Sequence, residues 1–483
     1  MSFVEPFHRA SHGASAALAE GAAPRPPRTV LMIAYAFPPE GYVGGRRTLK
    51  YCKYLGQFGW RPIVITIKPR SSAFQDERLT RQIPADVEVH RTRDVDGVDW
   101  MTWASTWWRR VRGGSSATAG VHASATADER IEVRPGRVER VKHLVERLLL
   151  DTPDSHILWV PLAFLRGARI LLTQKVDVIY SSSPPHSSHL VGPLLAKCFR
   201  KPHVVDFRDP WVIDGDGAET APDRIRRWQV RARRAVVTNA ARVTVVSPGE
   251  PEELRTVVPD FDYGRVAVLT NGYDPDDFPP DEPIAPDPRR FTITHAGTIY
   301  RDTGRVFFQA IERLIERAPD IRGVLRVNLV GDIDPSHVEL IARLEAAGVV
   351  RALGLQPHHL TLALMRSSDV LVLLQRGGTS RASHLPAKLF EYLYLGKPIF
   401  ALGAEGSLRE ILSASGLGFT AEPDDVEAVA ESIRLLYRNL RFGLVRLQPN
   451  RAYIEQFERR TLTERLARVL DEAAEWRRQQ ETI

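Results

Sequence analysis

The chain has 483 residues, 43% hydrophobic and 26% charged, which excludes a disordered protein and predicts two or three globular domains. Its formal net charge of +7 favours anionic partners, namely nucleotides, nucleic acid or anionic lipid, without choosing among them. Only Cys52 and Cys198 are present and no apolar run could span a bilayer, so we exclude a disulfide framework and a cysteine zinc site and expect a cytoplasmic protein.

The chain opens with a segment unlike the rest. Residues 1–28 are small, polar and proline-rich and lack the apolar core of a signal peptide, so we expect a disordered tail. From residue 29, short apolar runs alternate with segments of helical spacing. We expect strands at 29–35, 61–67, 176–182, 201–207 and 241–247, and helices at 48–60, 189–199 and 224–239. Apolar strands separated by helices predict a parallel sheet covered on both faces.

A composition break divides the chain. The segment Asp274–Arg290 is acidic and carries six prolines, which predicts a linker. The same alternation then restarts, with strands expected at 291–297, 326–332, 369–375 and 398–403 and helices at 303–316, 336–347, around Glu391 and at 425–438. The fold class is therefore α/β: two Rossmann-like, doubly wound parallel-sheet domains, 29–280 and 281–450, face each other across a cleft. Residues 451–483 return toward the first domain, mainly as one amphipathic helix at 453–476.

One segment interrupts the first domain. Within residues 99–150, Trp100, Trp103 and Trp107 share one helical face, next to the arginines of residues 109–112. Aromatic and basic side chains together are typical of a helix on a membrane surface. A helical insertion packed on its own domain fits the same pattern equally well.

A glycine pair follows the first strand. Gly44 and Gly45 precede a helix and would let the backbone approach a bulky anion, while the amide groups of the helix start face it. The loop lacks the spacing of a dinucleotide fingerprint and of a Walker loop. A bare Gly-Gly turn is common, so this feature alone identifies no ligand.

Polar residues follow the next strands of the first domain. The stretch 181–190 contains Ser183 and His186, which are candidates for a ligand site at the cleft edge, although ordinary capping explains at least one of its serines. Arg208 and Asp209 follow the strand at 201–207, where such a pair either has a functional role or braces a loop. The acidic Asp214–Gly217 loop could chelate a cation, but it lies past the strand end without histidine or cysteine partners, so we predict no metal site.

The second domain offers a phosphate site. Arg301 follows a strand and a glycine loop, where it could clamp phosphate oxygens. Pro386 suits the first turn of a helix, whose free amide groups attract phosphate, and Lys388 adds a charge. Glu391 shares a face with Lys388 and could accept hydrogen bonds from a ribose diol, or simply pair with Lys388.

Seven segments in this order resemble GT-B glycosyltransferases of family 4, in particular bacterial colanic-acid and O-antigen sugar transferases. The resemblance covers residues 29 to about 457, through FPPEGYVGGRR, DVIYSSSPPHSS, KPHVVDFRDPW, VTVVSPGE, VLTNGYDPDDF, HAGTIYR and PAKLFEYLYLGKP. It implies a GT-B fold with an N-terminal acceptor domain and a C-terminal nucleotide-sugar domain.

The resemblance also implies an activity. Such enzymes transfer a sugar from a nucleotide-diphosphate sugar with retention of anomeric configuration, and usually without a bound metal, so we expect no cofactor. The expected acceptor is a glycan or polyprenyl-linked precursor of a lipid-linked or cell-surface polysaccharide. We therefore expect attachment to the anionic inner face of the plasma membrane, and no specific nucleic acid partner.

Residue roles follow from the same resemblance. Glu391 would hold the ribose hydroxyls, the helix start from Pro386 to Leu389 would receive the diphosphate together with Lys388, and Arg301 would add charge. From the first domain, the glycine pair would approach the donor phosphates, and the Arg208 and Asp209 pair would lie near the reacting sugar and the acceptor.

The sequence departs from the family at one position and leaves other functions open. Many relatives carry a second glutamate where this chain has Ser383, which cannot supply the same anionic acceptor. A nucleotide-sugar epimerase of the same fold is an alternative. A noncatalytic scaffold that binds phosphate or nucleic acid is another, suggested by the basic run Arg224–Arg234.

Overall fold

The computed structural model describes residues 27–41, 43–70, 75–94, 153–209, 211, 223–278, 284–301, 303–375 and 385–482. The predictions for most of the N-terminal tail, for the tryptophan- and arginine-rich insertion, for the Asp214–Gly217 loop and for Ser383 therefore concern residues outside those described. Within the described ranges, no helix is both long and apolar enough to cross a membrane.

The first lobe is built on a parallel sheet, as predicted. Over the described residues its strand order is β3-β2-β1-β4-β5-β6-β7. In the register of β1, Met32 lies beside Val64 of β2 and Tyr180 of β4. The strands are β1 (Arg28–Ala34), β2 (Trp60–Ile67), β3 (Glu88–Thr92), β4 (Val178–Ser183), β5 (His203–Phe207), β6 (Arg242–Val245) and β7 (Val266–Val268). The helices are α1 (Val43–Leu55), η1 (Gly56–Phe58), α2 (Glu77–Thr80), η2 (Ile157–Trp159), α5 (Val160–Thr173), α6 (Ser188–Phe199), α7 (Asp223–Thr238), α8 (Glu250–Val257), η4 (Tyr263–Arg265) and η5 (Pro275–Asp277).

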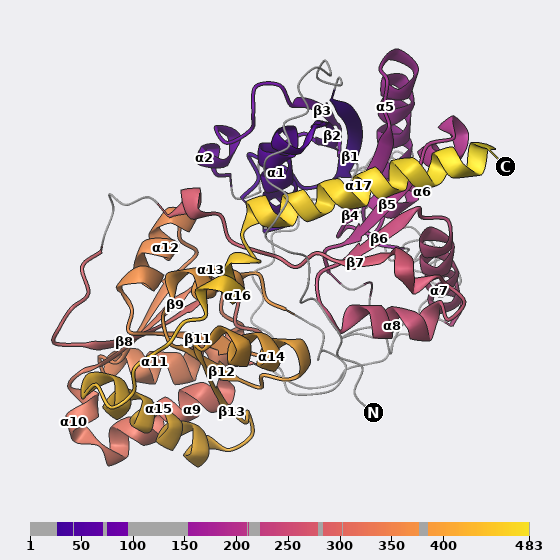
Figure 1. Ribbon diagram of the computed structural model, residues 1–483. Coiled ribbons are helices and arrows are strands. Elements are labelled where there is room, and N and C mark those ends of the chain that lie inside the picture. The colour runs from indigo at the N-terminus through magenta and orange to yellow at the C-terminus, as the bar shows by residue number, and fades with distance from the viewer. Residues whose placement is uncertain are drawn as a thin grey trace, which may run out of the picture.

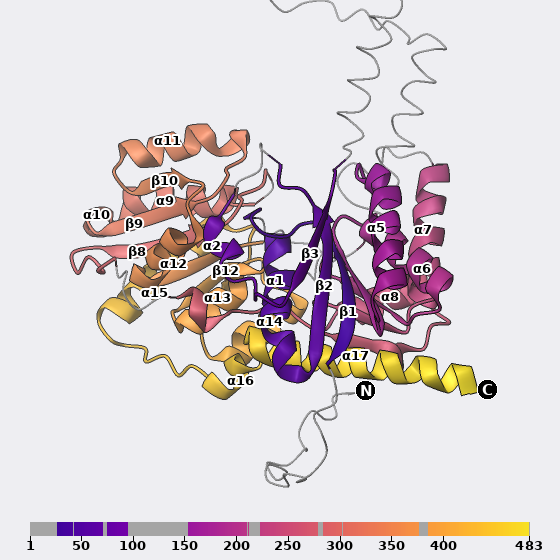
Figure 2. The same ribbon diagram turned by 90° about the horizontal axis from the view of Figure 1, so that it is seen from above.

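Helices cover both faces of this sheet, which is why its strands read as continuous apolar runs. On one face, Leu49 of α1 packs in the same cluster as Leu466 and Leu470 of the terminal helix. On the other face, Ala163 of α5 and Leu195 of α6 pack with β1 and β2. Figure 2 shows the terminal helix lying along the first lobe, far from most of the second.

The second lobe repeats this construction. Its described strands lie in the order β10-β9-β8-β11-β12-β13, and all pair in parallel. Helices α9, α11 and α15 cover one face, and α12, α13 and α14 cover the other. The strands are β8 (Phe291–Ala296), β9 (Leu325–Val330), β10 (Val350–Gly354), β11 (Val370–Leu374), β12 (Ile399–Leu402) and β13 (Gly418–Ala421). The helices are α9 (Arg305–Arg317), α10 (Pro319–Arg322), η6 (Pro335–His337), α11 (Val338–Ala346), α12 (His358–Ser367), α13 (Lys388–Leu395), α14 (Gly406–Ser415) and α15 (Val426–Arg441). The predicted fold class, two Rossmann-like parallel-sheet domains, is confirmed (Figure 1).

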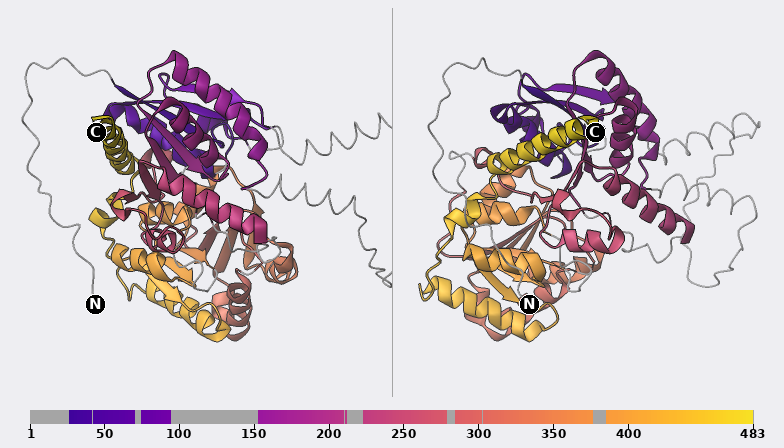
Figure 3. Two further views of the ribbon diagram at one scale, coloured as in Figure 1. Left: turned by 90° about the vertical axis from the view of Figure 1, so that its right-hand side faces the viewer. Right: turned by 45° about the vertical axis from the view of Figure 1, so that its right-hand side comes forward.

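The C-terminal segment crosses back to the first lobe in two pieces. The single helix predicted at 453–476 is wrong, because α16 (Arg451–Glu455) and α17 (Arg459–Thr482) are separate. Here the backbone pairs with Tyr273, the residue just before the linker: Tyr273 N–H donates to the Phe457 carbonyl at 3.1 Å, and Arg459 N–H donates to the Tyr273 carbonyl at 2.8 Å. Two chain segments thus cross side by side where the lobes meet (Figure 3).

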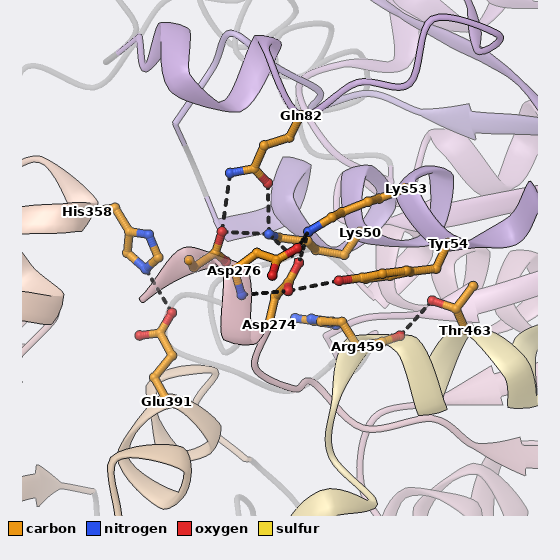
Figure 4. Close-up of polar contacts among 11 residues, drawn as sticks. Lys50, Lys53, Tyr54, Gln82, Asp274, Asp276, His358, Glu391, Arg459 and Thr463 are labelled. Atoms are coloured by element: carbon orange, nitrogen blue, oxygen red, sulfur yellow. Dashed lines mark hydrogen bonds and ion pairs between the residues drawn. The ribbon is translucent and has the colours of Figure 1, made fainter. Parts of the chain in front are cut away.

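Ion pairs hold the beginning of the linker against α1. Lys50 Nζ lies 2.7 Å from an Asp274 carboxylate oxygen and 2.6 Å from one of Asp277. Lys53 Nζ lies 2.8 Å from the same Asp274 oxygen, and Tyr54 Oη donates to the other at 2.9 Å. Asp274 is only 2% exposed, so the acidic stretch that composition identified as a linker begins as a buried junction (Figure 4).

Candidate active site

Helix α13 presents two charged side chains on the face away from its core. Leu389, Phe390 and Leu393 are fully buried among apolar neighbours of the second lobe. The 3.6-residue period therefore places Lys388 and Glu391, three residues apart, on a different side of the helix. These are the two residues that the sequence proposed for the diphosphate and the ribose.

Lys388 is held by a buried histidine. Its Nζ lies 3.0 Å from Nε2 of His295, whose Nδ1 faces the Val372 carbonyl at 3.1 Å. A carbonyl only accepts, so Nδ1 carries the ring proton and Lys388 donates to Nε2. Burial lowers the pKa of Lys388 to about 7, and it lowers the pKa of His295 well below its ordinary value. Lys388 is therefore a buried amine whose charge an anion would restore.

Glu391 pairs with a residue that sequence analysis did not find. Its Oε1 lies 2.9 Å from Nε2 of His358, at the start of α12. The alternative of a simple pair with Lys388 does not occur, because each side chain has a partner from another element. Burial alone would raise the pKa of Glu391, but His358, Arg46 and Arg459 together outweigh burial and lower it. Glu391 is therefore a carboxylate near neutral pH.

Both arginines that act on Glu391 come from outside the second lobe. Arg46 follows the glycine pair in α1, and Arg459 is the first residue of α17. Arg46 Nε and Arg459 Nη1 are buried without a hydrogen-bond partner among the described residues. Figure 4 shows the Arg459 side chain extending from α17 on the side where Glu391 and His358 lie. Two cations from outside the second lobe thus act on one carboxylate of α13. The GGRR stretch was the sequence signal that could have identified Arg46.

The glycine pair fits tightly into the first lobe. A Cβ on Gly44 would lie 3.2 Å from the Arg208 guanidinium carbon, and a Cβ on Gly45 would lie 3.2 Å from the Cα of Phe37. Any larger residue at either position would press on these neighbours. The structure therefore brings Gly44 together with Arg208, which is itself paired to Asp209 at 3.1 Å.

Behind that pair, the ends of β4 and β5 are buried. Asp206 is bound by Arg47 through two hydrogen bonds of 2.9 and 3.2 Å, so it braces the sheet. Ser183 is fully buried, and its hydroxyl has no partner among the described residues. His186 stacks on Trp211 with ring centroids 4.6 Å apart, and burial is the main cause that lowers the pKa of His186 to about 4. A neutral imidazole and a free hydroxyl thus lie along this edge.

Two predicted donor residues are not brought into this constellation. Arg301 is exposed in the loop between β8 and α9, where it contributes to lowering the pKa of Asp334. The Leu389 side chain is fully buried, and its N–H already donates to the Pro386 carbonyl at 3.0 Å. The structure thus shows no free donor on Leu389 for a diphosphate.

An open pocket of about 430 Å³ also lies between the two lobes. Its walls are residues of α8 and the preceding turn on one side, and the start of α14 on the other: Pro248, Gly249, Glu252, Glu253, Thr256, Gly406, Ser407 and Glu410. Over the residues that the structure describes, no group of three or more histidine, cysteine, aspartate or glutamate side chains could hold a metal ion.

Comparisons with known proteins agree with this architecture. Two family models match the chain, the glycosyl transferase 4-like domain over residues 111–272 and glycosyl transferases group 1 over residues 290–439. No curated protein matches the sequence.

Solved structures of the same fold align over nearly the whole chain. Anabaena Alr3699/HepE in complex with UDP-glucose is 14% identical, with a TM-score of 0.55 and coverage of 92% of this chain and 99% of that chain. Sucrose-phosphate synthase from Thermosynechococcus elongatus is 14% identical, with a TM-score of 0.53 and coverage of 94% and 98%. The α,α-trehalose-phosphate synthase from Burkholderia xenovorans in complex with glucose-6-phosphate is 12% identical, with a TM-score of 0.55 and coverage of 92% and 100%. The chain belongs to the GT-B glycosyltransferases of the group 1, family 4-like kind.

Proposed function

We propose that this glycosyltransferase uses a nucleoside diphosphate sugar as donor, binding it between α13 and the opposing start of α1. The observation that carries the proposal is that Arg46 and Arg459 act on Glu391, which shares one face of α13 with Lys388. Arg46 Nε and Arg459 Nη1 are buried without a hydrogen-bond partner among the described residues. Ammonium and guanidinium groups suit a diphosphate, and a carboxylate suits a ribose diol. Structural neighbours solved with UDP and UDP-glucose support this class of donor.

Transfer needs no protein nucleophile. The bond between the sugar and the diphosphate oxygen breaks, the acceptor oxygen bonds to the same carbon, and the acceptor proton passes to the departing phosphate oxygen. Lys388 and the guanidinium groups stabilise the charge that develops on the leaving group. Attack from the face that the diphosphate leaves retains the anomeric configuration, and this route requires no metal ion. Arg208 and Asp209, next to the Gly44 turn, are proposed to orient the reacting sugar.

The acceptor is proposed to enter from the first lobe. Ser183 and the neutral His186 lie at the carboxyl ends of the strands there, where ligands of such sheets bind. We propose a glycan or polyprenyl-linked acceptor at the cytoplasmic face of the membrane, supported by Trp100, Trp103 and Trp107, which lie outside the described residues. Flotation with anionic liposomes tests this attachment, and equal flotation after replacing the three tryptophans would remove the role of these residues in it.

The substitution Glu391→Gln tests the donor site. It keeps the shape of the side chain but loses the anionic acceptor, so we expect the donor KM to rise by about one order of magnitude while the melting temperature stays within a few degrees. Glu339→Gln, on the exposed face of α11, is the matched control and should behave as wild type. Wild-type kinetics in Glu391→Gln would refute the assignment. Donor conversion without any acceptor would instead indicate an epimerase.

A further inference from the structure

A second concave surface lies in the first lobe, on the side away from the second lobe. It is a pocket of about 480 Å³ at the carboxyl ends of β2 and β3, closed by α5. Figure 1 shows α5 standing on the far side of the first lobe from the second. The walls of the pocket are Lys68, Arg91, Thr92, Arg93, Leu162, Leu165, Arg166 and Arg169. Five of these eight side chains are cationic and none is acidic.

The charges of this pocket are not neutralised within the described part of the chain. Arg91 Nη1 donates to the Ile67 carbonyl, a neutral group. Glu40, the carboxylate that acts on Arg91, is paired with Arg70 at 3.2 Å. Asp94 follows Arg93 directly but accepts a hydrogen bond from Tyr35 Oη at 2.7 Å. Glu40 is therefore engaged by Arg70, whereas Asp94 keeps one buried oxygen, Oδ1, without a hydrogen-bond partner among the described residues and forms no ion pair with Arg93.

Elsewhere on the surface of the protein, exposed arginines commonly form ion pairs with acidic side chains. The described pairs include Arg234–Asp260, Arg313–Glu316, Arg343–Glu312, Arg409–Glu422, Arg434–Glu431 and Arg468–Glu464. No described residue forms an ion pair with Lys68, Arg93, Arg166 or Arg169. Like charges gathered around one hollow repel each other, so an anion is the ligand that would relieve them.

Leucines accompany these cations. Leu165 is 65% exposed and Leu172 is 76% exposed, and with Arg169 they recur at the spacing of one face of α5. Exposed leucines next to arginines are costly in water but suit the boundary between lipid headgroups and acyl chains. A free phosphate would use the cations and leave the leucines in water.

We propose that this pocket binds the headgroup phosphate of an anionic phospholipid, with Leu162 and Leu165 against its acyl region. The site is separate from the donor cleft, although both lie at the carboxyl edge of the same sheet. Neighbouring strands are about 5 Å apart, so along that edge β3 lies roughly 10 Å from β1, which precedes the Gly44 turn, and roughly 20 Å from β5, which precedes Arg208. Lipid bound there would hold the acceptor side of the first lobe against the bilayer.

Cosedimentation with vesicles of phosphatidylglycerol and phosphatidylcholine tests the proposal on the full chain. Arg166→Gln with Arg169→Gln should lower the partition coefficient about 25-fold, since each cation near an anionic surface contributes about fivefold. Arg322→Gln with Arg351→Gln removes the same charge from exposed positions of the second lobe and should have little effect. Leu165→Ser should weaken binding severalfold, whereas Leu355→Ser, at a leucine that is 64% exposed, should not.

The alternatives give different results. Equal losses in the pocket pair and the control pair would overturn the proposal, because they would indicate only net charge. Competition by inorganic pyrophosphate at micromolar concentration, with no loss in Leu165→Ser, would assign the pocket to a soluble phosphate and overturn the lipid assignment. Nucleoside diphosphate release measured without vesicles should be the same in all these variants, so failure here would leave the proposed donor site standing.

Discussion

The buried amine of Lys388 predicts a pH dependence of donor binding. Its pKa of about 7 in the free protein means that half of the molecules carry no ammonium charge at neutral pH. A bound diphosphate favours the charged form and raises this pKa, so binding above pH 7 must take up a proton. Below pH 7 the amine is already charged. Donor affinity should therefore be full in mild acid and fall as the pH rises through 7.

The size of the effect follows from the free-state titration. If the donor binds only the ammonium form, Kd should rise about 30-fold between pH 6 and pH 8.5, or about 2 kcal/mol, for a free pKa near 7. His295 stays neutral and Glu391 stays ionised over this range. The pKa of His295 lies well below its ordinary value because of burial, and the balance of burial with nearby cations lowers the pKa of Glu391.

Isothermal titration calorimetry with UDP-glucose measures this directly. Repeating the titration at pH 8 in buffers of different ionisation enthalpy gives the proton uptake, which should approach one per donor bound. Lys388→Met has a similar length but no titratable group, so its weaker Kd should not change with pH. A flat profile in the wild type, or a slope that survives in Lys388→Met, would refute the role given to this amine.

Further predictions concern the junction between the lobes at Asp274 and Gly272, and the Glu391 carboxylate. Asp274→Ala removes one of the two carboxylates that pair with the buried Lys50, so the free energy of unfolding measured in urea should fall by about 2–3 kcal/mol. Gly272→Ala places a Cβ 2.1 Å from a carbonyl oxygen of the segment before α17, and limited proteolysis should then release this helix faster than in wild type. His358→Ala should raise the donor KM severalfold, and adding it to Glu391→Gln should change little further, because both disturb one hydrogen bond. Additive effects in that double variant would argue against the pair.

The fold could be predicted because its information is local. Strands such as β1, fully apolar from Val30 to Ala34, are recognisable as buried on both faces without knowledge of their neighbours. The break between α16 and α17 could not, since both flanking sequences have helical spacing. There Tyr273, just before the linker, forms backbone hydrogen bonds with Phe457 and Arg459, which lie far along the chain.

The part of the candidate site that depends on local sequence could also be predicted. The position of Lys388 and Glu391 on one face of α13 follows from their spacing, but their partners do not. His358 and His295 come from other elements. The i, i+3 spacing suggested a direct pair of Lys388 with Glu391, but each side chain instead contacts one of these histidines. The action of Arg46 and Arg459 on Glu391 depends on how the two lobes meet, which local sequence does not determine.

The central claim is that the crevice beside α13 holds the diphosphate of a sugar donor. A panel of nucleoside diphosphate sugars, read by nucleoside diphosphate release with and without membrane lipid extract, tests it most directly. We expect wild-type protein to turn over at least one donor, and we expect Lys388→Met and Glu391→Gln to lose that turnover at low donor concentration. No release or binding of any donor by the wild type, or equal turnover in both variants, would contradict the claim.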